Sequence, residues 1–155
     1  MNILGIESSC DETAAAVVRN GNELLSNVVH SQIDIHAQYG GVIPEVAARS
    51  HIEMINPVIN KALTDAKMTW DDIDGIAVTY APGLIGSLLV GTLAARTLAI
   101  TKNKPLYPIH HVEAHVYANF ITKQKEPLNF NLPNQQPSFP LLALIVSGGH
   151  TQLAL

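Results

Sequence analysis

Two histidines, His111 and His115, are the side chains of this 155-residue chain whose types and spacing point most directly to chemistry. Residues four apart on a helix lie on one face, one turn above the other. Two imidazole nitrogens placed in this way can converge on one metal ion at about 2.1 Å each. Histidine pairs at this spacing more often have a structural role, but this pair directly follows a strand-like segment, where the active-site loops of α/β proteins collect. The pattern predicts two metal ligands, with the others coming from elsewhere.

A glutamate between the two histidines separates this motif from that of a zinc metalloprotease. Glu113 lies two residues after His111 and therefore off the face that the histidines share. Metalloproteases of the His-Glu-x-x-His type place their catalytic glutamate directly after the first histidine. Glu113 does not match that position, so the spacing argues against a protease. His30, His36 and His51 have no partner at ligand spacing, and we expect them to be structural.

A second candidate for chemistry is the glycine-containing turn Ser147-Gly148-Gly149, which follows the apolar segment 141–146 (LLALIV). The backbone N–H groups of adjacent glycines can approach an anion closely, and a hydroxyl adds a further donor. The turn is therefore a candidate phosphate cradle, with an ordinary hairpin turn as the alternative. Neither the Walker loop nor the dinucleotide-binding glycine pattern is present.

An acidic turn forms the third candidate. Asp11 and Glu12 follow the first apolar segment of the chain, and their carboxylates could hold a metal through water or orient a substrate amine. A solvated acidic turn is the commoner case and stays open as the alternative. Cys10 lies in the same turn, but its acidic neighbours disfavour the thiolate, so we assign it no nucleophilic role.

Composition limits the classes of function. Apolar residues make up 47% of the chain and charged residues 14%, as in a globular protein, and the formal net charge is −4. A protein of this charge does not bind nucleic acid through bulk electrostatics, so an RNA substrate would require a local basic patch or a basic partner. Cys10 is the only cysteine, which excludes an intrachain disulfide and fits a reducing compartment.

No segment of the sequence suggests targeting or membrane insertion. Met1 leads directly into a strand-like segment without a basic region or a cleavage site. The longest apolar run, 84–100, contains polar residues and is shorter than the ~20 residues of a membrane span. We therefore expect a cytoplasmic protein with no membrane association.

The elements that must position these side chains follow from the apolar patterns. Segments 2–7, 13–18 and 24–31 predict an antiparallel meander, with a turn at Asn20-Gly21. Helical spacing covers 44–66, a capping box marks a short helix at 69–72, and long apolar segments predict a helix over 84–101. Strands are expected at 75–80, 106–109 and 141–146, and a helix from His110 or His111 to about Thr122. Helices alternating with strands after a meander predict an α/β fold with a mixed sheet.

The beginning and the end of the chain share a pattern. Segment 6–13 (IESSCDET) reads strand, polar turn, threonine and second strand, and segment 145–151 (IVSGGHT) repeats that order with one residue fewer. Such a repeat suggests a duplicated fold. The alternative is coincidence between two short apolar strands, which these few residues alone would favour. The proline- and asparagine-containing segment 123–139, which reads as a linker, raises the odds of duplication.

Five motifs in order resemble one family across the whole chain. They are 5–13 (GIESSCDET), 39–45 (YGGVIPE), 81–84 (APGL), 111–115 (HVEAH) and 146–153 (VSGGHTQL). Together they are similar to the TsaD-type tRNA N6-adenosine threonylcarbamoyltransferases, once called Gcp or O-sialoglycoprotein endopeptidases. The resemblance implies an actin/Hsp70/sugar-kinase-like (ASKHA, ribonuclease H-like) fold. It implies a first domain over 1–122, a linker over 123–140 and the opening of a second domain over 141–155.

The resemblance also implies an activity and a set of residues. The family transfers the threonylcarbamoyl group from threonylcarbamoyl-AMP to N6 of the adenosine next to the anticodon of certain tRNAs. By similarity, His111 and His115 are ligands of one divalent metal, Fe²⁺ or Zn²⁺. Ile145, Val146, Ser147, Gly148 and Gly149 would contact the adenylate or the threonylcarbamoyl group. Asp11 and Glu12 would face the active site, where we assign one of them the catalytic role of orienting or deprotonating the amine.

Family members are about twice as long as this chain, and their third protein ligand is an aspartate in the C-terminal half. The resemblance thus predicts part of an enzyme whose partners are tRNA, a TsaB-like paralogue and a TsaE-like ATPase, with a homodimer as another arrangement. Two alternatives remain: a non-catalytic scaffold resembling the TsaB-type paralogues, which dimerise through the first domain, and a metalloprotease. The retained His-x-x-x-His pair argues against the scaffold, and its spacing argues against the protease.

Overall fold

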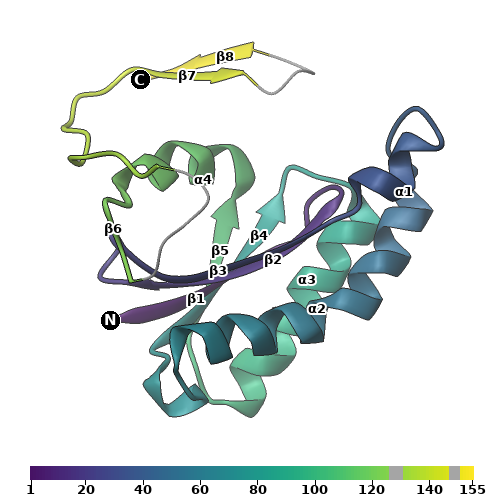
Figure 1. The fold of residues 1–155 in the computed structure, drawn as a ribbon, viewed down its shortest axis with the longest axis horizontal. Coiled ribbons are helices and arrows are strands. Elements are labelled where there is room, and N and C mark those ends of the chain that lie inside the picture. Colours follow the sequence, from purple (N-terminus) through teal and green to yellow (C-terminus); the bar gives the residue numbers. More distant parts are fainter. Residues whose placement is uncertain (126–130, 147–150) are drawn as a thin grey trace.

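The structure is a computed structural model that describes residues 1–125, 131–146 and 151–155, and a six-stranded mixed sheet forms its centre (Figure 1). The order of the strands across the sheet is β5-β4-β1-β2-β3-β6. Their bounds are β1 Asn2–Glu7, β2 Glu12–Arg19, β3 Glu23–Ser31, β4 Gly75–Ala81, β5 Leu106–His110 and β6 Lys123–Gln124. The α/β mixed sheet that the sequence predicts is therefore confirmed.

The first three strands form the predicted antiparallel meander. Strand β1 pairs with β2, with Glu7 opposite Ala14, and β2 pairs with β3. Asn20 and Gly21 turn the chain between β2 and β3 with φ of 53° and 73°, a conformation that asparagine and glycine adopt most readily. Strands β4 and β5 then join in parallel to β1, as crossover helices require.

Helices cover the two faces of the sheet unequally (Figure 1). Helices α2 (Pro44–Ala66) and α3 (Ile85–Thr101) pack on one face, and α4 (His111–Tyr117) lies on the other. Because side chains alternate along a strand, the core beneath α2 and α3 takes every second residue of each strand. Its members include Leu4, Ile6, Ala15, Val17, Ile76 and Val78 from the sheet, and Ile55, Ile59, Leu63 and Ala95 from the helices.

Short elements account for the differences from the expected boundaries. Helix α4 ends at Tyr117 and continues as the 3-10 turn Ala118–Phe120, short of the expected Thr122. Lys123 and Gln124, placed in the linker by the sequence pattern, form the edge strand β6 parallel to β3. Two backbone hydrogen bonds to Asn22 O and one to Leu24 O hold this segment, and such pairing needs no apolar pattern. The short helix α1 (Ile33–Ala37), of five residues, was not expected.

The predicted short helix with a capping box is present as the 3-10 turn Trp70–Asp72. The carboxylate of Asp72 accepts hydrogen bonds from the backbone N–H and the hydroxyl of Thr69, each at 2.8 Å. These two bonds hold the pKa of Asp72 below its ordinary value.

The end of the chain forms a separate antiparallel pair, β7 (Ala143–Val146) with β8 (Thr151–Ala154). In Figure 1 this pair lies beyond α4, away from the six-stranded sheet. Val146 is opposite Thr151, as Glu7 is opposite Ala14 in the pair β1–β2. The expected strand over 141–146 is thus confirmed from Ala143 onward. The registers differ by one residue from the half-repeat, because Thr151 itself is opposite Val146 whereas Ala14, the residue after Thr13, is opposite Glu7. That this pair opens a second domain stays a prediction.

Candidate metal site at the end of strand β5

The two histidines of the HVEAH motif lie side by side on the first turns of α4. Strand β5 ends at His110, and His111 is the first residue of the helix. The Nε2 atoms of His111 and His115 are 3.2 Å apart, and the two rings are nearly perpendicular with centroids 4.7 Å apart. The predicted helical spacing therefore brings the two ring nitrogens together.

This spacing fits a metal ion. Two nitrogens that each lie about 2.1 Å from one ion are roughly 3.0 to 3.4 Å apart when their angle at the ion is between octahedral and tetrahedral. The 3.2 Å between the two Nε2 atoms falls inside that interval. The donor set, two neutral imidazoles, is one that zinc and iron both accept. In the described residues (1–125, 131–146 and 151–155) no third histidine, cysteine or carboxylate completes a cluster that could hold the ion.

A carboxylate contacts His111 on the other side of its ring. Oε2 of Glu7 lies 3.1 Å from Nδ1 of His111, and Oγ of Ser9 lies 3.2 Å from the same nitrogen. Glu7 also accepts hydrogen bonds from the hydroxyl of Thr79, at 2.6 Å, and from the backbone N–H of Ser9, at 2.5 Å. Glu7 ends β1, and Thr79 lies on the neighbouring strand β4, so adjacent strands supply this polar group.

The environment of Glu7 favours its ionised form. Burial opposes ionisation of the carboxyl, but hydrogen bonds from Ser9, Thr79 and His111 outweigh that effect and hold the pKa of Glu7 below its ordinary value of 4.5. An ionised carboxylate only accepts hydrogen bonds, so the proton between Glu7 and His111 belongs to Nδ1 of the histidine. Nε2 of a neutral His111 then carries a lone pair.

The turn after β1 is fastened from the side of α2 and α3. The hydroxyl of Ser8 donates to Ser87 O at 2.8 Å, and the hydroxyl of Ser87 donates to Cys10 O at 3.3 Å. His51, from α2, is fully buried, with its Nε2 3.0 Å from Cys10 O and its Nδ1 2.7 Å from the hydroxyl of Thr13. His51 therefore has the structural role that we expected.

Asp11 and Glu12 lie in this turn without reaching the histidine pair. The backbone oxygen of Asp11 accepts a hydrogen bond from Gln32 N, and Glu12 begins β2 opposite Ser31 with its side chain exposed. Among the described residues, no hydrogen bond or ion pair joins either carboxylate to His111 or His115. Burial, followed by the adjacent Asp11, raises the pKa of the Cys10 thiol, in line with the expectation that Cys10 is no nucleophile.

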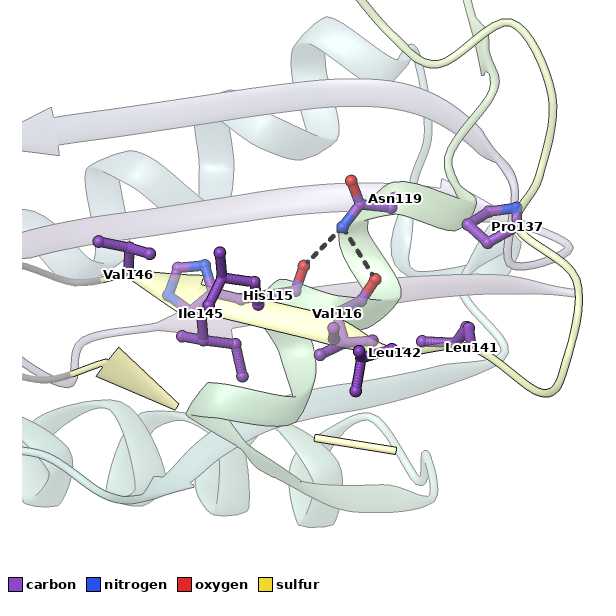
Figure 2. A pocket seen from close by; sticks show the side chains of 10 residues that line it. His115, Val116, Asn119, Pro137, Leu141, Leu142, Ile145 and Val146 are labelled. Carbon is purple, nitrogen blue, oxygen red and sulfur yellow. Dashed lines mark hydrogen bonds between the residues drawn. The ribbon is translucent and has the colours of Figure 1, made fainter. Parts of the chain in front are cut away.

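A pocket of about 550 Å³ separates α4 from the segment that leads into β7 (Figure 2). Figure 2 shows the side chains that line it. Helix α4 and the 3-10 turn after it contribute His115, Val116 and Asn119, and β7 contributes Ile145 and Val146. Asn119 donates to the carbonyls of His115 and Val116, which closes the end of the helix. The structure thus brings two of the expected substrate-binding residues beside one expected ligand. Ser147, Gly148 and Gly149 lie outside the described residues.

A second pocket, of about 460 Å³, lies between α4 and the sheet. Small side chains on the α4 face of the strands leave this space, and Glu7, Thr79 and His115 border it. The small residues are Gly5, Ala14, Ala16 and Ala77. His115 therefore stands between two hollows, one open to the sheet and one open to β7.

Comparison with known proteins identifies the family of this chain. The family model described as "TsaD: tRNA N6-adenosine threonylcarbamoyltransferase" matches residues 23–155. The chain belongs to the TsaD family. The resemblance that the five motifs suggested is confirmed.

Curated TsaD-family relatives cover the chain almost completely. A tRNA N6-adenosine threonylcarbamoyltransferase of Listeria welshimeri is 57% identical over 154 residues, which is 99% of this chain and 41% of the relative. The protein of the same description from Caldicellulosiruptor bescii is 53% identical over 155 residues, 43% of its length. The chain thus spans about two fifths of the length of these relatives.

The solved structures that resemble this chain confirm its fold. YeaZ from Pseudomonas aeruginosa superposes with a TM-score of 0.54 at 18% identity, over 72% of this chain and 46% of that one. A second structure, described as similar to the peptidase YEAZ from the same organism, has a TM-score of 0.52 at 18% identity. At this identity the likeness concerns the fold alone.

Sequence reasoning missed Glu7, Ser9 and Thr79 as members of this candidate site. The sequence contained a pattern that could have indicated two of them, because Glu7 and Thr79 lie near the ends of two apolar strands. Carboxyl ends of neighbouring parallel strands meet at one edge of a sheet, and β1 and β4 are parallel neighbours. The missing information was that these two strands are adjacent.

Proposed function

We propose that this chain forms part of an enzyme that transfers the threonylcarbamoyl group from threonylcarbamoyl-AMP to N6 of the adenosine next to the anticodon of tRNA. Membership of the TsaD family supports the reaction class. The observation that carries the proposal for this chain is the pair of Nε2 atoms, 3.2 Å apart, at the end of β5. The relative named for this activity is longer, and the chain spans 41% of it.

In this proposal His111 and His115 hold one divalent ion, Fe²⁺ or Zn²⁺. Such an ion supplies Lewis acidity, which polarises a carbonyl or neutralises a phosphate. The chain's own contribution is to hold two imidazoles in place from one helix, with Glu7 and Ser9 behind the first of them. The third protein ligand comes from outside the described residues or from another chain.

The substrate lies, in this proposal, in the pocket between α4 and β7. Ile145 and Val146 line it, and Ser147, Gly148 and Gly149 follow directly in the sequence. Backbone N–H groups of that glycine turn would support negative charge on the adenylate or on the reacting carbonyl. The apolar side chains of β7 exclude water from one side.

The transfer itself forms one bond and breaks another. The exocyclic amine of adenosine attacks the carbonyl carbon of the threonylcarbamoyl group, and the bond from that carbon to the phosphate oxygen breaks, so that AMP leaves. The amine loses a proton, and we assign its removal or the orientation of the amine to Asp11 or Glu12. Both carboxylates belong to the turn that follows β1, the strand that also carries Glu7.

Partner proteins complete this proposal. The net charge of −4 argues that other chains or segments supply much of the RNA-binding surface. Helix α3 presents an apolar face at helical spacing, whose residues are Ile85, Leu89, Leu93 and Ile100, all at least half exposed. We assign this face to a TsaB-like paralogue, with a second copy of the chain as the other arrangement, and a TsaE-like ATPase as a further partner.

No helix in the described part of the chain is long and apolar enough to cross a membrane. A tRNA substrate places the proposed activity in the cytoplasm, the compartment that the sequence also suggested. The apolar face of α3 would equally suit a non-catalytic scaffold, but a scaffold has no use for a histidine pair at metal-binding distance. Glu113 is exposed and contributes to a different pocket from His115, which disfavours a protease.

A chimera tests the proposed activity with the rest of the enzyme supplied. This chain would replace the matching 154 residues of the Listeria welshimeri relative, and transfer of radiolabelled threonylcarbamoyl from threonylcarbamoyl-AMP to tRNA would be measured with the partner proteins present. We expect the chimera to be active, His111→Ala and His115→Ala to abolish transfer, and His30→Ala to leave it unchanged. A folded chimera without activity, or an active His111→Ala chimera, would refute the proposal.

A further inference from the structure

We propose that Glu7 is a positioning residue, which keeps the proton of the His111 ring on Nδ1 and thereby presents the lone pair of Nε2 toward His115. This inference rests on the proposed metal-binding role of the two histidines and deepens it. It concerns a residue that the motif spacing left without a role, 104 positions away from His111 in the sequence.

The first step of the argument is that Glu7 itself is held firmly. Both of its oxygens are engaged, Oε1 by the backbone N–H of Ser9 and Oε2 by the hydroxyl of Thr79. The side chain is 30% exposed, so water competes for it only in part. A carboxylate anchored from two sides is a fixed acceptor, and it imposes its geometry on the third partner, Nδ1 of His111.

The second step is that the acceptor decides the tautomer. Nδ1 lies 3.1 Å from Oε2 of Glu7 and 3.2 Å from Oγ of Ser9. A bare Nδ1 would turn its lone pair toward a carboxylate oxygen, so the arrangement is attractive only with the proton on Nδ1. In a neutral ring Nε2 is then the unprotonated nitrogen, and Nε2 is the atom that lies 3.2 Å from Nε2 of His115.

The third step is that the fold places Glu7 on the correct face. Residues alternate along β1, so Leu4 and Ile6 point into the core while Gly5 and Glu7 face α4. Strand β4 adds Thr79 on the same side. A carboxylate behind a metal-binding imidazole is a recurring arrangement, since it fixes the orientation of the ring and raises the basicity of the ligand nitrogen.

The decisive experiment reads the tautomer of His111 without any metal. Two-dimensional ¹H–¹⁵N NMR spectra of the histidine rings distinguish Nδ1–H from Nε2–H in the full 155-residue chain. In the wild type we expect Nδ1–H. In Glu7→Gln, Ser9 N–H keeps the amide oxygen, which turns the amide NH₂ toward His111. Because that group donates, Nδ1 becomes the acceptor, and the proton moves to Nε2.

Glu113→Gln is the matched control, because it makes the same change on an exposed position of α4. We expect it to leave the tautomer of His111 unchanged. Ser9→Ala separates the two neighbours of Nδ1, and the ring should stay in the Nδ1–H form because Glu7 remains. If Glu7→Gln does not fold, the wild type and Ser9→Ala decide, since an Nε2–H ring in either one overturns the inference.

Zinc titration of the same proteins supplies the second readout. Disruption of an outer-shell partner typically weakens metal binding by about tenfold to a hundredfold, and we expect a loss of that order for Glu7→Gln but none for Glu113→Gln. Equal affinities of Glu7→Gln and the wild type would overturn the inference. If the wild type binds no zinc at these histidines, the proposed function fails, whereas the metal-free tautomers still decide the role of Glu7.

Discussion

Both ring nitrogens of His111 have a neighbour within the chain. Nδ1 faces Glu7 and Ser9, and Nε2 faces His115. Contacts within the chain therefore hold the ring at both of its nitrogens. Contacts that restrict a side chain to one orientation lower the entropic cost of binding through it.

At the residue scale the first prediction concerns the histidine pair. The chain alone should bind Zn²⁺ weakly, because two protein ligands leave the coordination sphere open. His111→Ala and His115→Ala should each abolish the binding seen in a calorimetric titration, and His30→Ala, on strand β3, should not. Tight binding that disappears only in the double variant would show that other residues contribute ligands.

The second prediction concerns acid unfolding and Glu7. The pKa of Glu7 is lower in the folded chain than its ordinary value of 4.5, so Glu7 stabilises the fold at pH values above its unfolded pKa. This contribution disappears as the pH falls below about 4.5 through the folded pKa. Urea unfolding between pH 6 and pH 3 should show a steeper loss of stability in the wild type than in Glu7→Gln. Identical slopes would contradict the prediction.

At the element scale, the turn that follows β1 depends on its contact with α3. Gly83 approaches so closely that a Cβ there would lie 2.5 Å from Ser9 O, and Leu84 N donates to the same oxygen at 2.7 Å. Further along the helix, a Cβ at Gly91 would overlap the hydroxyl of Ser8. The start of α3 thus fixes the position of the turn that follows β1. Because Ser9 lies in that turn, α3 also influences the surroundings of Glu7.

The third prediction tests this contact. Alanine at position 91 would favour the helix by about 1 kcal/mol, but overpacking against buried Ser8 costs about 1–3 kcal/mol. Gly91→Ala should therefore lower the Tm. In the double variant Ser8→Ala with Gly91→Ala the overlap with the hydroxyl is gone, so the loss should be smaller than the sum of the single losses. Strict additivity would contradict the contact as the cause.

The fourth prediction concerns the exposed face of α3. The side chain of Ile85 is 87% exposed, so Ile85→Lys should leave the Tm unchanged. If this face binds a TsaB-like paralogue, the same variant should weaken that association in analytical ultracentrifugation. Val29→Lys, at a 49% exposed position on β3, is the control and should associate normally. Unchanged association of Ile85→Lys would place the partner elsewhere.

At the scale of the whole molecule, two units of different character follow one another. The six-stranded sheet has a continuous core with α2 and α3, whereas β7 and β8 pair with each other and β7 contacts α4. Leu144, Val146 and Leu153 in this pair are about two thirds exposed. An apolar hairpin with so little cover contributes little to the stability of the sheet unit.

The fifth prediction follows from this division. A chain ending at Lys125 should retain the cooperative unfolding of the sheet unit and a similar Tm, because β6 and its hydrogen bonds to β3 are kept. Differential scanning calorimetry of both lengths checks this. A shortened chain that unfolds without cooperativity would show that residues 126–155 belong to the same folding unit.

Local pattern was informative wherever one element decided the outcome. The apolar runs 2–7 and 13–18, the Asn20-Gly21 turn and the spacing of His111 and His115 all predict features present in the structure. The edge strand β6 escaped prediction because two residues paired through their backbones carry no side-chain pattern. The roles of Asp11 and Glu12 and of Ser147 to Gly149 stay predictions.

The amino-acid sequence by itself determined the family, the mixed sheet and the helical pair of imidazoles, because each depends on motifs or on spacing within a few residues. Only the tertiary structure decided which side chains contact the other ring nitrogen, Nδ1, of His111. Glu7 and Ser9 contact His111, and Thr79 bonds to Glu7, because β1 lies beside β4 and β5 leads into the start of α4. No local pattern encodes such a meeting, since it arises from the order of strands in the sheet.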